Sequence, residues 1–85
     1  MVENQNSSPP GPLPVQVQCY SGSVYAERPR RIAWQGHWQT VSQVLDRWRA
    51  PQGPGFRVSI ESGLVLALQY HEQTDHWTAI VQTRR

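Results

Sequence analysis

Residues 28–49 read RPRRIAWQGHWQTVSQVLDRWR and contain three of the four tryptophans and five of the eight arginines in the chain. The first part alternates: Ile32 and Trp34 point to one side of an extended strand over roughly Arg30 to Gln35, and Arg31 points to the other. This alternation predicts a strand with one face on a core and one face on solvent.

The dipeptide Gly36-His37 predicts a two-residue hairpin loop, since glycine in the first central position is typical of a type II′ turn. Such a loop pairs Gln35 with Trp38. Residues that pair across a hairpin share a face of the sheet. Trp38 is therefore expected on the outer face, beside Ala33.

The segment from Val41 to Trp48 allows two interpretations. Its apolar residues Val41, Val44, Leu45 and Trp48 have the i, i+3, i+4, i+7 spacing of one helix face. A strand with one bulge near residues 42–43 would also direct Val41, Val44 and Trp48 toward the core. The short length and the β-branched residues favour the bulged strand, and a short helix stays the alternative.

Further strands are expected at 15–20, 56–61, 64–70 and 77–81. The residues expected to face the core are Val15, Val17, Cys19, Phe56, Val58, Ile60, Leu64, Leu66, Leu68 and Tyr70. We expect a loop over 50–55, a two-residue turn at 62–63 and a polar loop over 71–76. Five to six short strands predict an all-β fold, a small antiparallel β-barrel or strongly curled meander that hides its sheet edges.

Residues 1–14, MVENQNSSPPGPLP, are polar and rich in proline. They offer too little apolar surface to offset the entropy of ordering, so we expect a disordered N-terminal arm. Residues 15–85 then form one small barrel domain. A break is expected at 21–23, and residues 24–27 either continue the first strand or belong to a loop.

Charge and cysteine content limit the class of protein. The net charge of +2 is too small to indicate a nucleic-acid binder by itself. The single cysteine, Cys19, cannot form an intramolecular disulfide and gives no sign of an oxidising compartment. The sequence shows neither an apolar run of about 18 residues nor the layout of a signal peptide, so a cytoplasmic location is expected.

The sequence offers no arrangement typical of an enzyme. His71, Glu72, Asp75 and His76 match no standard spacing of metal ligands, and a solvated loop explains them more simply. No serine lies in a nucleophile elbow, no glycine-rich loop precedes a helix, and Cys19 is expected in the core. We therefore predict no catalytic activity, no cofactor and no metal.

Tryptophan and arginine form the remaining candidate site. The candidate binding residues are Trp38, Arg31, Arg57, Arg28, Arg47 and Arg49. These two residue types dominate protein-interface hot spots, and an exposed tryptophan beside arginines can also stack a nucleobase. Three interpretations stay open for this Arg/Trp face: a protein partner, single-stranded nucleic acid, or a structural role in which Trp38 packs beneath a loop.

Several segments resemble a known family: ERP at 27–29, IAWQG at 32–36, VLDRWR at 44–49, FRV at 56–58, and Trp77 with its apolar strand. Together they resemble the bacterial domain of unknown function 6504, over roughly residues 24–81. Related segments also occur at the C-terminus of proteins resembling Y-family translesion polymerases. The resemblance implies an accessory module in DNA repair or damage tolerance and supplies no catalytic residues; the proline-rich arm departs from it.

Overall fold

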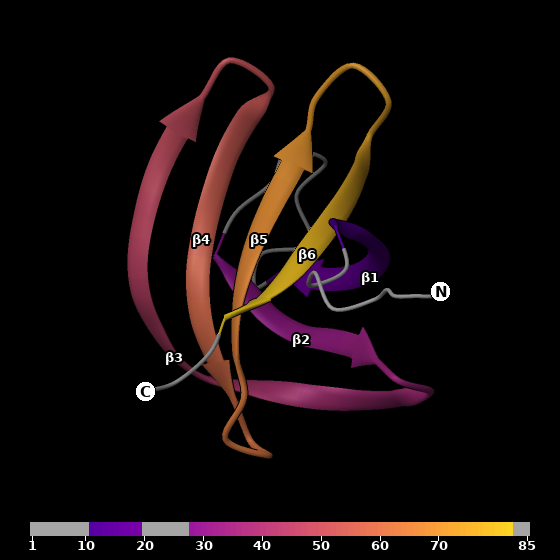
Figure 1. The fold of residues 1–85 in the computed structure, drawn as a ribbon, viewed down its shortest axis with the longest axis vertical. Coiled ribbons are helices and arrows are strands. Elements are labelled where there is room, and N and C mark those ends of the chain that lie inside the picture. Colours follow the sequence, from indigo (N-terminus) through magenta and orange to yellow (C-terminus); the bar gives the residue numbers. More distant parts are fainter. Residues whose placement is uncertain (1–10, 20–27, 83–85) are drawn as a thin grey trace, which may run out of the picture.

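The computed structural model describes residues 11–19 and 28–82. Every regular element in these residues is a strand, and each strand pairs antiparallel with the next. The strands are β1 (Leu13–Cys19), β2 (Pro29–Trp34), β3 (His37–Ala50), β4 (Gly53–Ile60), β5 (Val65–His71) and β6 (His76–Gln82). Pairing of β1 with β6 closes the barrel, which confirms the predicted small antiparallel β-barrel (Figure 1).

The core is a single cluster of inward-facing side chains from β2, β4, β5 and β6. Its buried members are Ile32, Trp34, Phe56, Val58, Ile60, Leu66, Leu68, Tyr70, Trp77 and Ala79. The predicted inward residues of β1 and Leu64 pack against this cluster. Because aromatic and branched side chains fill the interior, candidate functional groups lie on the outer wall or at the ends of the barrel.

The β2–β3 hairpin turns one residue earlier than predicted. Gln35 and Gly36 form the loop, with φ angles of 52° and 84°, and two positive φ angles are typical of a type I′ turn. The predicted pairing of Gln35 with Trp38 is therefore wrong, and Ala33 lies opposite Trp38. Moving the loop by one residue shifts each pairing by two positions, which leaves the predicted faces unchanged.

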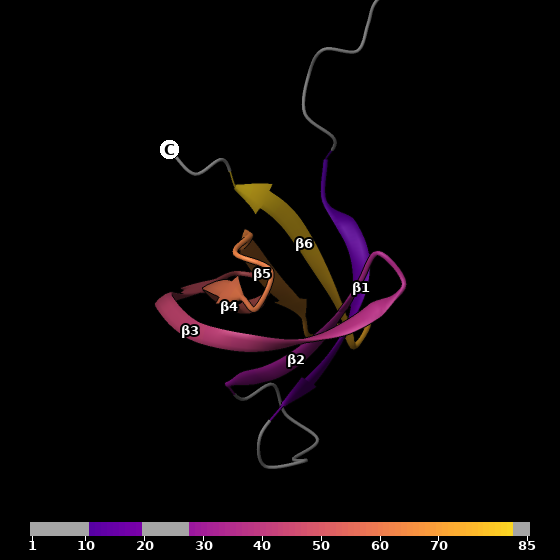
Figure 2. The ribbon, with the colours of Figure 1, turned by 90° about the horizontal axis from the view of Figure 1, so that it is seen from below.

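Strand β3 is 14 residues long and sweeps from its pairing with β2 to its pairing with β4 (Figure 2). The structure confirms the predicted bulged strand and not the short helix. The prediction had one bulge, whereas the register shifts twice, between Val41 and Gln43 and between Val44 and Asp46. Val41 and Val44 pack against the core as predicted. Leu45 is 40% exposed, whereas the helix alternative would have placed it on the apolar face with Val41 and Val44. It is the extra residue between two rungs of the ladder, which leaves it outside.

The predicted loop over 50–55 is wrong, because only Pro51 and Gln52 form a turn. The glycines that suggested a loop belong to β4, where other groups approach the backbone closely. A Cβ at Gly53 would lie 2.8 Å from the carbonyl oxygen of Tyr70, and one at Gly55 would overlap the indole of Trp48. Glycine inside a strand often marks such an approach.

The turn between β4 and β5 is one residue longer than predicted. Gly63 has a φ of 97° and donates its N–H to the carbonyl of Ile60 at 2.8 Å, and the N–H of Ile60 bonds to the carbonyl of Leu64 at 3.0 Å. The extra residue places Val58 opposite Leu66, so both point inward. A two-residue turn would have set inward residues of one strand against outward residues of the other.

The strand ends also differ from the prediction. Strand β1 begins at Leu13, which pairs with Ala79, so the predicted arm over 1–14 includes two residues of the barrel. The polar loop shortens to 72–75 because His71 and His76 pair with each other. Predictions for 1–10, 20–27 and 83–85 lie outside the described residues.

No helix in the described ranges has the length and apolar character that a membrane crossing needs.

Candidate functional site

Gln18, Arg31 and Trp38 lie side by side on the outer wall formed by β1, β2 and β3. The ladder places Arg31 between Gln18 and Thr40 and sets Trp38 opposite Ala33. The Gln18 Oε1 accepts hydrogen bonds from the Arg31 Nε at 3.0 Å and Nη2 at 2.8 Å. The guanidinium carbon lies 5.4 Å from the centroid of the Trp38 ring, within the range of a cation–π contact.

This arrangement fixes a cation without neutralising it. Gln18 is uncharged, and among the residues that the structure describes Arg31 forms no ion pair. Trp38 is 42% exposed, so one ring face meets the guanidinium while much of the side chain meets solvent. A shallow groove of about 430 Å³ extends from Trp38 past Gln16 to His76. The wall therefore presents a charged and an aromatic group in a fixed geometry.

Arg57 does not join this surface, contrary to the predicted Arg/Trp face. It lies on β4 opposite Asp46, which is eight residues after Trp38 on β3. Eight residues of extended strand span about 26 Å, so the two side chains occupy separate parts of the wall.

The other three candidate arginines are also placed elsewhere. Arg47 extends its guanidinium toward the ring of Phe56, 5.9 Å from the centroid. Arg49 forms an ion pair of 2.9 Å with Glu72. Arg28 precedes β2 and borders a groove beside β3. The structure thus brings together only Arg31 and Trp38 from the predicted set.

A second exposed tryptophan, Trp48, was expected in the core, and that prediction is wrong because it is 38% exposed. Its Nε1 donates to the Gln69 Oε1 at 3.2 Å. The Gln69 Nε2 donates in turn to the carbonyls of Gly53, Pro54 and Tyr70 at 2.8, 3.1 and 3.0 Å. The only sign of this surface in the sequence is Gly55. By its sequence context Gly55 suggests a loop, and only the pairing of β3 with β4 shows that it lies opposite Trp48.

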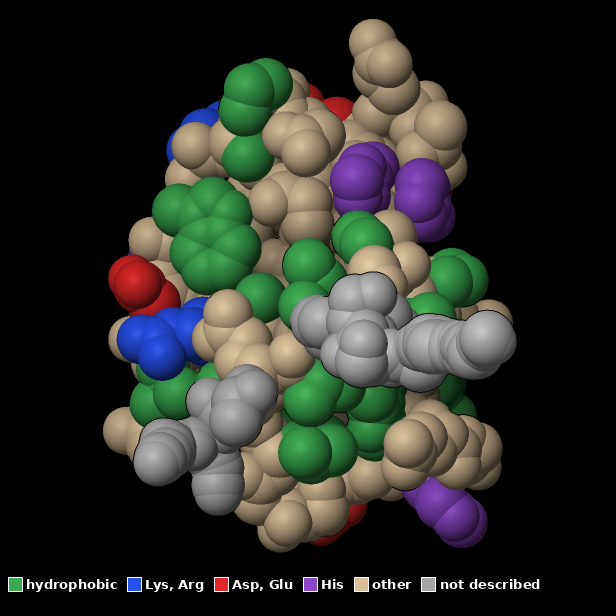
Figure 3. Space-filling view, in the orientation of Figure 1, with side chains coloured by type: hydrophobic (Ala, Val, Ile, Leu, Met, Phe, Trp, Pro, Cys, Tyr) green, Lys and Arg blue, Asp and Glu red, His purple; other side chains and the backbone are tan. Residues whose placement is uncertain are grey.

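The histidines of the predicted polar loop form a pair at the ends of β5 and β6, where Figure 3 shows two histidines side by side. The rings of His71 and His76 stack at 4.7 Å, tilted by only 5°. Thr78 Oγ1 bonds to the His71 Nε2 at 3.0 Å, and Thr74 Oγ1 bonds to the His76 Nδ1 at 2.5 Å.

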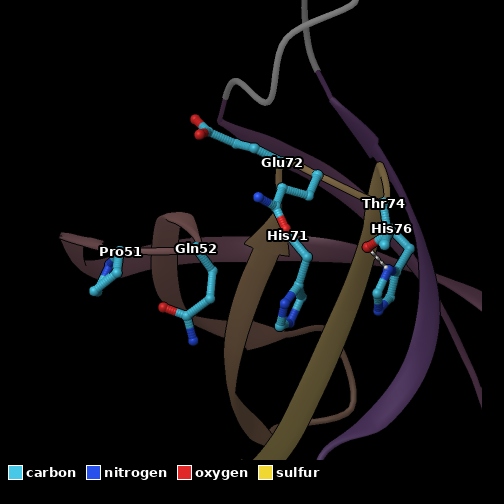
Figure 4. A pocket seen from close by; sticks show the side chains of 7 residues that line it. Pro51, Gln52, His71, Glu72, Thr74 and His76 are labelled. Carbon is cyan, nitrogen blue, oxygen red and sulfur yellow. Dashed lines mark hydrogen bonds between the residues drawn. The ribbon is translucent and has the colours of Figure 1, made fainter.

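These histidines border a groove of about 530 Å³, in which Gln52, His71 and His76 point to the same side and Glu72 points away (Figure 4). Stacked, nearly parallel rings do not aim their nitrogen lone pairs at one point. Among the described residues, no three or more histidines, cysteines or carboxylates gather in a way that could hold a metal ion. The groove instead offers hydrogen-bonding groups to a ligand.

Comparisons with known proteins do not assign this chain a family or a function. No family model, no curated protein and no solved structure matches this chain. The resemblance to the domain of unknown function 6504 stays a prediction from the quoted segments. The two outer surfaces, one around Trp38 and one around Trp48, are the candidate binding sites of the described residues.

Proposed function

We propose that this protein is a non-catalytic interaction module that docks an acidic segment of a protein partner on Arg31 and Trp38. The observation that supports this proposal is the guanidinium of Arg31, held by a neutral glutamine and resting on an exposed indole. A carboxylate from a partner would form charge-assisted hydrogen bonds with it, and the indole would cover an apolar side chain. Tryptophan and arginine are the residues most enriched in interface hot spots.

The same contacts favour a protein over single-stranded nucleic acid at this surface. Arg31 already covers one face of the Trp38 ring, and that face is closed to a stacking base. A role for the module in DNA repair or damage tolerance rests on the sequence resemblance alone. A cytoplasmic location likewise rests only on the sequence.

Affinity capture with matched variants tests the proposal. The full chain, Trp38→Ala and Arg31→Gln are each used on native lysate treated with nuclease, and Ile80→Ala serves as the control because Ile80 is equally exposed on β6, at 41%. We expect the full chain and the control to recover the same protein, and the two surface variants to lose at least about 30-fold in affinity, as for a hot spot of 2 kcal/mol.

A charge-reversal experiment then separates an acidic partner from any other. Arg31→Glu should abolish binding of the purified partner, and changing the contacting partner carboxylate to arginine should restore it. In the affinity capture, equal recovery of the partner by the full chain, Trp38→Ala, Arg31→Gln and Ile80→Ala would contradict the proposal. Capture that disappears with nuclease, together with a salt slope of about −0.7 per phosphate contact, would instead establish nucleic acid as the ligand of this surface.

A further inference from the structure

Trp48 is held against the barrel by one face of its ring. Three adjacent ring atoms, Cε2, Nε1 and Cζ2, are the atoms that a Cβ on Gly55 would meet, so the indole lies over the backbone of β4. Its Nε1 is bonded to Gln69, and three backbone carbonyls fix that amide. Since Trp48 is nevertheless 38% exposed, the opposite ring face opens to solvent. The indole is a rigid aromatic platform.

Arg57 lies next to this platform. It follows Gly55 by two residues on the outer side of β4, and Gly55 is the residue opposite Trp48. Arg57 is therefore one diagonal step from Trp48, about 7–8 Å between the backbones. Asp46 is opposite Arg57, yet among the described residues Arg57 forms no ion pair. A cation that pairs with no carboxylate among the described residues stands beside an exposed aromatic ring.

The geometry points to a second binding site, in which single-stranded nucleic acid stacks a base on Trp48 and places a neighbouring phosphate on Arg57. The partly exposed ring of Trp48 differs from that of Trp38, which already carries Arg31. Stacking contributes about 1–3 kcal/mol per base and tolerates any base, because every base has a flat face. Duplex bases are stacked on each other and cannot reach the ring, which limits the ligand to single strands.

The histidine groove extends the same track. His71 follows Gln69 by two residues on the outer side of β5 and is bonded to Thr78, the residue opposite Gln69. A strand leaving the platform across Gln69 therefore reaches His71 and His76, where Gln52 also points into the groove (Figure 4). These side chains offer donors and acceptors to base edges and phosphates.

Fluorescence anisotropy of the full chain with a labelled oligothymidylate of about 16 nucleotides, the upper site size of OB-fold barrels, tests this site. Trp48→Ala should weaken binding by about 5- to 150-fold, the equivalent of one stacked base. Trp48→Phe should keep most of the affinity. Arg57→Gln should reduce the salt slope by about 0.7, the loss of one phosphate contact. Leu13→Ala, the matched control because Leu13 is similarly exposed at 42%, should bind like the unchanged chain.

Several results would overturn this inference. The unchanged chain could fail to bind the oligonucleotide at low salt, or Trp48→Ala could bind it equally well. A duplex of the same length could bind as tightly as the single strand, which would indicate general attraction to phosphates. Loss of the captured protein partner in Trp48→Ala would make the platform a protein interface. Because the protein proposal depends on Trp38 and Arg31, either proposal can fail alone.

Discussion

At the scale of single residues, the two exposed tryptophans differ in what lies against their rings. Trp38 is opposite Ala33, and the arginine one diagonal step away reaches across to its ring. Trp48 is opposite Gly55, so its ring lies on the backbone itself. The neighbour across the ladder thus decides whether an exposed indole presents a cation or an open aromatic face.

Gly55→Ala should lower the free energy of unfolding by about 1–2 kcal/mol, because the added methyl displaces the Trp48 ring and breaks its hydrogen bond to Gln69. Chemical denaturation measures this change, with Gly11→Ala as the control since no atom would meet its Cβ. In a Trp48→Ala background the same substitution should become neutral or stabilising. An equal loss in both backgrounds would contradict the described packing.

At the scale of elements, turns and bulges adjust the register so that every inward face meets the core. The left-handed backbone at Gln35 is an example, because glutamine rarely adopts a φ of 52°. The type I′ turn tolerates it because the twist of this turn matches the twist of the strands. The hairpin that positions Trp38 therefore carries a local strain that a better turn residue would relieve.

Gln35→Asn should stabilise the protein by about 0.5–1 kcal/mol, part of the roughly 1–2 kcal/mol that left-handed backbone costs a residue other than glycine. Asparagine followed by glycine is the preferred pair for this turn. The matched control is Gln52→Asn, since Gln52 lies in the β3–β4 turn without a positive φ. Thermal melts that show no gain at position 35, or the same gain at both positions, would contradict the assigned turn.

The sequence predicted the faces of the strands better than their ends. Alternation placed Ile32, Trp34 and Leu66 in the core, since a side-chain period of two does not depend on where a turn falls. Turn positions were wrong because glycine has two uses, positive φ at Gly36 and close packing at Gly55. Only the paired ladder separates these uses, and for that reason the Trp48 platform could not be predicted.

At the scale of the whole molecule, closure between β1 and β6 leaves one filled interior and an outer wall without a free sheet edge among the described strands. Small domains of this size gain only about 3–5 kcal/mol from a single core. Each buried side chain therefore carries a large share of the stability, while the outer wall can vary for binding. The predicted Arg/Trp face is split because β3 curves around this wall (Figure 2).

Leu68→Ala should reduce the free energy of unfolding by about 2–5 kcal/mol, because Leu68 is fully buried and its truncation leaves a cavity in the core. That loss is comparable with the whole stability of the domain, so a large fraction of the Leu68→Ala molecules should be unfolded at room temperature. Leu45→Ala should change stability by about 0.5 kcal/mol or less, since Leu45 is exposed. Circular dichroism during urea titration checks both, and similar losses would contradict the assigned core.

The docking of a protein partner on Arg31 and Trp38 is tested most directly by photo-crosslinking inside cells. A photoreactive phenylalanine analogue replaces Gln16, which is exposed and lies in the same cross-strand row as Ala33 and Trp38. We predict a protein adduct that resists nuclease, disappears with Arg31→Gln and does not form from Gln43, an exposed position farther along β3. An adduct that survives Arg31→Gln, an adduct that nuclease digests, or no adduct at all would contradict docking of a protein on Arg31 and Trp38.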